Sequence, residues 1–182
     1  LLELFDQSGA SVFSECVALE TPHYLPETVD TSFASLAQNL IPAVLHQSFD
    51  SPQQLTHLLL KQDDCPPMAL AALDMGAWAI KAINQNQSLA HCLGATKTAV
   101  DCGVVIGMSD SLQHVRSLVT KECDRGYKKI KLKISPGCDY DYFAAVRSDH
   151  GNDIQLVVDA NGSYDVDDMD ALVALDAFDL LM

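Results

Sequence analysis

The sequence predicts an α/β protein, namely a partial (β/α) barrel of the TIM type preceded by part of an α+β capping domain. Two patterns predict this class. The early chain has a short strand pair and then helices, whereas the later chain alternates apolar strands with amphipathic helices. We therefore expect two domains, a partial N-terminal capping domain in residues 1–98 and the first half of a (β/α) barrel in residues 99–182.

The first domain opens with a predicted hairpin. Alternating apolar residues predict strands over 1–5 and 11–18, with a turn at 6–9. The spacing of apolar residues, together with helix-start signals such as Ser-Pro at 51–52, predicts helices in the rest of this domain. These predicted helices cover residues 28–45, 51–60 and 66–84, with a short helical turn at 89–93.

The second domain repeats a βα unit. Predicted strands cover residues 102–108, 127–134 and 154–159, predicted helices cover 111–123, 139–148 and 166–175, and 178–182 begins another strand. The strands are nearly continuous apolar runs, as expected for parallel strands covered on both faces. Four strands cannot close an eight-stranded barrel, so we expect the missing strands to come from other sequence or from another chain. With no initiator methionine and an apolar end, we expect a chain cut from a longer protein at both ends.

The composition argues against several kinds of partner. The chain has 25 acidic and 11 basic residues and a formal charge of -14, whereas a nucleic-acid surface needs a basic patch. It has no apolar run long enough for a membrane span and no basic, signal-like start. None of its six cysteines forms a CxxC pair, which favours a reducing compartment. We expect a cytoplasmic protein that binds neither nucleic acid nor membrane.

Three lysines alternate with apolar residues in YKKIKLKISPGCD, residues 127–139. Strand geometry puts Lys129, Lys131 and Lys133 on one face and the Ile and Leu side chains on the other. We expect the lysine face to point into the barrel, with Lys133 nearest the end where barrel enzymes hold their catalytic groups. Partial desolvation and the neighbouring charge of Lys131 both favour the neutral form, so Lys133 could act as a general base. The alternative is an edge strand with a solvated lysine face.

A second motif is LVVDANGSY, residues 156–164, in which Asp159 ends an apolar strand and Asn161 comes two residues later. Asp159 lies one predicted βα unit beyond Lys133, which favours a neighbouring position at the same end of the barrel. A carboxylate is a ligand that Mg²⁺ prefers, but one Asp cannot hold the ion, so further carboxylates are expected on later strands. The alternative is a simple turn residue, because Asp-Ala-Asn-Gly also suits a turn.

These motifs resemble those of the enolase superfamily. KIKLKISPGCD and VVDANGSY are similar to the KxK, PGxD and DxN motifs of its muconate-lactonizing-enzyme subgroup, in the branch of o-succinylbenzoate synthases and N-acylamino acid racemases. The early segment SECVALETPHYLPETVDTSF, with Tyr24 and Glu27, resembles the capping-domain motif of that branch. The resemblance covers nearly the whole chain, and it is specific for the branch rather than for one activity.

The resemblance implies a Mg²⁺-dependent carbon–oxygen lyase of menaquinone biosynthesis, which removes a proton α to a carboxylate and forms an enediolate. It implies that Lys133 is the acid/base, Lys131 its electrostatic partner, Asp159 the first of three metal-ligand carboxylates and Asn161 a substrate-binding residue. The other ligands, the opposing lysine and the substrate-covering loop would lie outside these residues.

Two alternatives remain open at this point. Racemisation of N-acylated (N-succinyl) amino acids would use the same lysine pair without the elimination, and an inactive fragment would assemble only with other chains. For the enzyme we also expect a small-molecule carboxylate substrate and a homo-oligomer.

Overall fold

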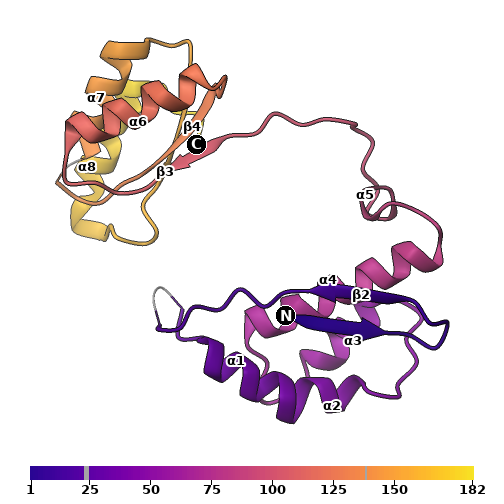
Figure 1. The fold of residues 1–182 in the computed structure, drawn as a ribbon. Coiled ribbons are helices and arrows are strands. Elements are labelled where there is room, and N and C mark those ends of the chain that lie inside the picture. Colours follow the sequence, from indigo (N-terminus) through magenta and orange to yellow (C-terminus); the bar gives the residue numbers. More distant parts are fainter. Residues whose placement is uncertain (23–24, 138) are drawn as a thin grey trace. The chain divides into compact units, whose positions relative to one another are not determined.

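The computed structural model describes residues 1–22, 25–137 and 139–182, which divide into two compact units. Unit 1 is residues 1–98 and unit 2 is residues 99–182. Figure 1 shows the hairpin and helices of unit 1 and the parallel strands and helices of unit 2. Tyr24, the aromatic residue of the early motif, lies outside the described residues.

Unit 1 begins with the predicted hairpin. Strands β1 (Leu2–Phe5) and β2 (Ser11–Ser14) pair antiparallel, with Leu2 opposite Ser14 and Phe5 opposite Ser11. The second strand is shorter than the predicted 11–18. The turn is closed by the Asp6 carboxylate, which accepts hydrogen bonds from the amides of Ser8 and Ala10.

A helical segment with an internal π turn comes after the hairpin. It consists of α1 (Val29–Ser35), the π-helix η1 (Leu36–Leu40) and α2 (Ile41–Val44). The sequence predicted one regular helix over 28–45, so the π turn is a correction. Its physical reason is Pro42, which has no amide hydrogen for the regular ladder; the amide of Ile41 instead donates to Leu36 five residues earlier.

The hairpin and the other helices of unit 1 enclose one core. The helices are α3 (Pro52–Leu59), α4 (Pro67–Asn84) and the short α5 (Leu89–Cys92). Six buried residues form the centre of this core, with Leu2 and Leu4 of the hairpin packed against them: Leu36, Leu40, Leu55, Leu59, Ala69 and Leu73. The hairpin lies so close to α4 that a Cβ at Gly76 would stand 2.6 Å from Leu4 Cδ1. A larger residue at this position would therefore force the Leu4 side chain to move.

Unit 2 holds a three-stranded parallel sheet in the order β3-β4-β5. The strands are β3 (Val104–Ile106), β4 (Lys129–Lys133) and β5 (Gln155–Asp159). Helix α6 (Leu112–Asp124) joins β3 to β4, and helix α7 (Asp139–His150) lies between β4 and β5. The chain continues through the 3₁₀-helix η2 (Val166–Asp168), α8 (Met169–Ala174) and the 3₁₀-helix η3 (Leu175–Phe178). The predicted α/β class with parallel strands is confirmed.

The end of the chain differs from its prediction. Residues 178–182 were expected to begin a strand, but η3 includes Phe178 and no strand follows it. Asp179 has a left-handed backbone with φ 48°, and only two backbone bonds then join the chain to β5, from Leu181 to Leu156 and from Val158 to Met182. Two bonds are too few for a regular ladder, although the segment does run along that edge of β5.

None of the helices in the described ranges is both long enough and apolar enough to cross a membrane.

Candidate active site

The two faces of β4 differ as the alternation of its sequence predicts. Ile130 and Leu132 are 0% and 2% exposed and pack in one core cluster with Val119 of α6 and Phe143 of α7. The lysines point the opposite way and are only half-buried. Val105 of β3, opposite Lys131 in the register, is 54% exposed. The apolar face is therefore covered by helices within unit 2, and the lysine face is the open one.

The register of the sheet brings the two motifs together. Lys131 lies opposite Val157, and Lys133 lies opposite Asp159, the last residue of β5. Because both strands are parallel, their carboxyl ends meet at the same edge of the sheet. In open and closed α/β folds, this edge is where ligands bind.

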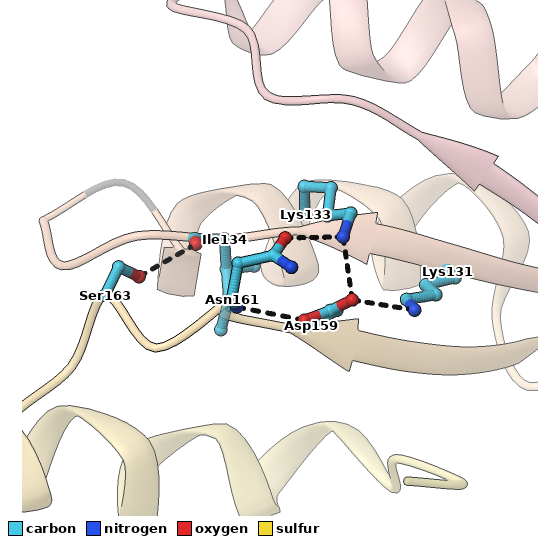
Figure 2. A network of polar contacts seen from close by, with 6 residues as sticks. All are labelled: Lys131, Lys133, Ile134, Asp159, Asn161 and Ser163. Atoms are coloured by element: carbon cyan, nitrogen blue, oxygen red, sulfur yellow. Dashed lines mark hydrogen bonds and ion pairs between the residues drawn. The ribbon is translucent and has the colours of Figure 1, made fainter. Parts of the chain in front are cut away.

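At this edge, the carboxylate of Asp159 holds both lysine side chains (Figure 2). Its Oδ2 atom lies 2.7 Å from Lys131 Nζ and 2.7 Å from Lys133 Nζ. Lys133 Nζ also donates to the side-chain oxygen of Asn161. The backbone amide of Asn161 donates to Asp159 Oδ1 at 2.9 Å. The four residues singled out from the sequence thus form one connected polar network, while the function of each stays a prediction.

The charges of this network favour an ionised carboxylate. Hydrogen bonds from Lys131 and Lys133, and then from the Asn161 amide, hold the pKa of Asp159 well below its usual range. The side chain of Asp159 is 25% exposed, which leaves it within reach of a ligand or an ion. A reachable carboxylate that is ionised at neutral pH and lies at the end of a strand has the chemistry of a ligand for a hard cation.

The described residues supply only part of such a metal site. No group of three His, Cys, Asp or Glu side chains in residues 1–22, 25–137 and 139–182 is arranged to hold an ion. Asp159 offers the right donor type but is a single carboxylate whose oxygens are already engaged by two lysines and an amide.

Three residues near the site were missed by the sequence reasoning. Ser163 Oγ donates to the carbonyl oxygen of Ile134 at 3.3 Å, which joins the loop after β5 to the end of β4. The hydroxyl of Tyr164 donates a hydrogen bond to the carboxylate of Asp139, which is buried at the start of α7. A signal for Asp139 did exist, because it is the acidic residue of the PGxD motif, but nothing in the sequence pairs it with Tyr164.

The chain was compared with protein-family models and with curated and solved proteins. No family model matches it. A curated o-succinylbenzoate synthase of Enterococcus faecalis is 32% identical over 182 residues, which is all of this chain and 49% of that protein. An N-succinylamino acid racemase of Amycolatopsis sp. is 36% identical over 170 residues, or 93% of this chain and 46% of that protein.

Solved structures show the same similarity. A protein described as an unknown member of the enolase superfamily, from Enterococcus faecalis, has a TM-score of 0.87 and 32% identity, over 98% of this chain and 48% of its own. The chain belongs to the enolase superfamily.

A further solved structure shares the fold alone. It is a dipeptide epimerase from Methylococcus capsulatus in complex with a Mg ion, which is 19% identical with a TM-score of 0.84, over 98% of this chain and 52% of its own. The chain spans about half the length of the superfamily relatives it matches.

Proposed function

We propose that the complete protein containing this chain is an o-succinylbenzoate synthase, which removes a proton α to a substrate carboxylate and then expels hydroxide from the neighbouring carbon. The observation that carries the proposal is the convergence of Lys131, Lys133 and Asn161 on Asp159, where two parallel strands end. The similarity to o-succinylbenzoate synthases over the whole chain supports the choice of reaction.

Lys133 is the proposed acid/base. It reaches past the end of β4 and already donates to two oxygen atoms, so its ammonium group is placed to exchange protons with a substrate bound at this edge. Lys131, two residues earlier on the same face of the strand, supplies a second positive charge that favours a carboxylate substrate. Asn161 presents its side chain from just beyond the end of the neighbouring strand β5 and would help to orient the substrate.

Asp159 is the proposed first ligand of a Mg²⁺ ion, and the remaining carboxylate ligands would come from outside these residues. When bound, Mg²⁺ would neutralise the negative charge that develops on the substrate carboxylate as the α-proton leaves. This chemistry requires a substrate of one class, a small carboxylic acid with an acidic α-hydrogen.

Racemisation of N-succinylamino acids is the second candidate function. A racemase is 36% identical over 93% of this chain, and it would need the same lysine on one face of the α-carbon. The two reactions differ in the step after proton removal, since a racemase returns a proton to the other face and a synthase loses hydroxide. A third possibility is a chain without activity unless it assembles with others.

The test uses the complete protein with Mg²⁺, offered in turn the dehydration substrate that yields o-succinylbenzoate and an N-succinylamino acid in D₂O. Product formation in the first assay supports the synthase, and α-deuteration with loss of optical rotation in the second supports the racemase. If neither substrate is turned over, the proposal is wrong.

Substitution of Lys133 tests its proposed role as the acid/base. Lys133→Ala should lower kcat on the order of 10²- to 10⁴-fold, as expected for loss of a general acid/base. Lys129→Ala is the matched control, because Lys129 shares the strand face but lies well away from Asp159 in the register, opposite Gln155 at the other end of β5. Wild-type turnover by the Lys133 variant would contradict the role given to this residue.

A further inference from the structure

The acidic residue of the PGxD motif has no part in the network around Asp159, yet it is buried in the same unit. Asp139 is only 5% exposed and is the first residue of α7. Its Oδ1 atom accepts from the Tyr140 amide at 3.0 Å, and its Oδ2 atom accepts from the hydroxyl of Tyr164. Burying a carboxylate destabilises the fold unless its oxygens are hydrogen-bonded. The bond to Tyr164 therefore indicates a structural role for Asp139.

Tyr164 belongs to the loop that carries Asn161. The loop leaves β5 at Asp159 and takes a left-handed backbone twice in succession, at Asn161 with φ 47° and at Gly162 with φ 75°. Asn161, Gly162 and Ser163 are all exposed. Since these three residues bury almost nothing, a few specific hydrogen bonds must hold the loop in place.

Two hydroxyl groups supply those contacts on the far side of the turn. Ser163 Oγ donates to the Ile134 carbonyl oxygen at 3.3 Å, directly after β4 (Figure 2), and the Tyr164 ring packs against the core cluster of unit 2. The Tyr164 hydroxyl then reaches the start of α7. The loop after β5 is therefore tied to the loop after β4, the strand that carries Lys133.

We infer that Asp139 and Tyr164 are a positioning pair, which holds the loop after β5 so that Asn161 stays against Lys133 and the Asn161 amide stays on Asp159. The inference rests on the proposed function, because it assigns these two residues to the geometry of the proposed acid/base. Neither residue touches the reacting atoms; they act through Asn161 and Asp159.

The activity test compares Tyr164→Phe with Tyr140→Phe in the complete protein. Tyr164→Phe keeps the ring and removes only the hydroxyl, whereas Tyr140 is an exposed neighbour at the other side of Asp139. For Tyr164→Phe we expect kcat to fall on the order of tenfold to a hundredfold and KM to change less than about threefold, because the proton-transfer geometry loosens while substrate contacts persist. Tyr140→Phe should match the wild type.

A conservative substitution of Asp139 tests the other member of the pair. In Asp139→Asn the side chain can still hydrogen-bond the Tyr164 hydroxyl, so it should retain more activity than Tyr164→Phe, with Asp141→Asn on the exposed face of the same helix as its control. In the double variant Asp139→Asn should add little to the loss caused by Tyr164→Phe, since the hydroxyl through which Asp139 acts is already absent. Additive losses, or a Tyr164→Phe variant as active as Tyr140→Phe, would overturn the inference.

A second readout does not depend on activity. The amides of Asn161 and Ser163 are hydrogen-bonded to Asp159 Oδ1 and to the Ala160 carbonyl oxygen, so their hydrogen exchange reports on the loop itself. Both should exchange faster in Tyr164→Phe than in Tyr140→Phe, while amides within β4 stay unchanged. If the wild type turns over neither substrate, the proposed function is wrong. If the amides of Asn161 and Ser163 exchange equally fast in Tyr164→Phe and Tyr140→Phe, the positioning pair is wrong as well.

Discussion

At the scale of single residues, Asp159 is shared by two cationic side chains. Lys131 and Lys133 both approach the same carboxylate oxygen at 2.7 Å, and the Asn161 amide occupies the other. A divalent cation at Asp159 would compete with both lysines for that oxygen, since like charges repel at these distances. Metal binding would therefore release Lys133 toward the substrate, which links the proposed ligand to the proposed acid/base.

Glu27 of the early motif has a structural part in unit 1. It is 7% exposed, and its carboxylate accepts hydrogen bonds from Ser32 Oγ at 2.7 Å, the Met68 amide at 2.9 Å and the Ala69 amide at 3.0 Å. These amides belong to the first turn of α4, where a negative charge is favourable. Glu27 thus joins the start of α1 to the start of α4.

Replacing Glu27 should destabilise unit 1. Glu27→Ala leaves one buried amide, one partly buried amide and a buried hydroxyl without their acceptor, so we expect the free energy of unfolding to fall by about 2–3 kcal/mol. Urea unfolding followed by circular dichroism measures this change. Glu20→Ala, at an exposed position a few residues earlier, is the control and should change stability by less than about 0.5 kcal/mol. Equal stability of the two variants would contradict the anchoring role.

The hydrogen bonds to Asp6 predict that the stability of unit 1 depends on pH. Hydrogen bonds from the Asn84 side chain, from the side chain and amide of Ser8 and from the Ala10 amide lower the pKa of Asp6 to about 2, from 3.8. Because the folded-state pKa is the lower one, the stabilisation is complete above about pH 4 and is lost as the pH falls through 2. The stability difference between the wild type and Asp6→Asn should be constant from pH 7 to about 4 and then shrink. A difference that stays constant to the lowest pH at which the chain is folded would refute this.

At the scale of elements, Arg147 connects three segments of unit 2. From α7, its guanidinium donates to the carbonyl oxygens of Phe178 at 2.8 Å, Gly151 at 2.8 Å, Ile154 at 2.9 Å and Asp179 at 3.0 Å. This arginine therefore has a structural role in unit 2. It closes the turn before β5 and holds the end of η3 beside it.

Arg147→Met should therefore destabilise unit 2 by about 2–4 kcal/mol, because it removes charged hydrogen bonds to four carbonyl groups. The comparison is Arg116→Met, which breaks an ion pair with Asp149 at 2.6 Å on the helix surface. Exposed pairs of this kind contribute at most about 1 kcal/mol. Thermal unfolding of both variants gives the difference, and a larger loss for Arg116→Met would contradict the assignment.

At the scale of the whole molecule, the proposed site is incomplete within these residues. One carboxylate and two lysines lie at the ends of β4 and β5, in a chain that spans about half the length of its relatives. Octahedral coordination of Mg²⁺ needs several oxygen ligands. Activity is accordingly a property proposed for the complete protein.

Removal of the metal tests whether the activity of the complete protein depends on Mg²⁺. Dialysis of the complete protein against a chelator should abolish turnover, and added Mg²⁺ should restore it, because the charge on the substrate carboxylate is otherwise unbalanced. The 182-residue chain alone should show no turnover in either condition. Full activity in the presence of chelator would contradict the proposed role of Asp159.

Much of the fold could be predicted because it depends on local patterns. The hairpin, the positions of most helices and the three parallel strands agree with apolar periodicity and helix-start residues. The π turn at Leu36–Leu40 was missed, since a proline inside an apolar helical pattern can be accommodated in several ways. The segment 178–182 resembled a strand by composition, but pairing depends on a neighbour and not on composition alone.

The sequence by itself determined which side chains share a face and which strand ends carry polar groups. Alternation in KIKLK and the position of the DAN motif selected Lys131, Lys133 and Asp159, and the family resemblance added Asn161. Only the tertiary structure decided the register that sets Lys133 against Asp159, the bond between Tyr164 and Asp139, and the reach of Arg147 to the chain end. These contacts join residues 25–31 positions apart, and a linear pattern has no period at that distance because loop lengths and packing set the separation.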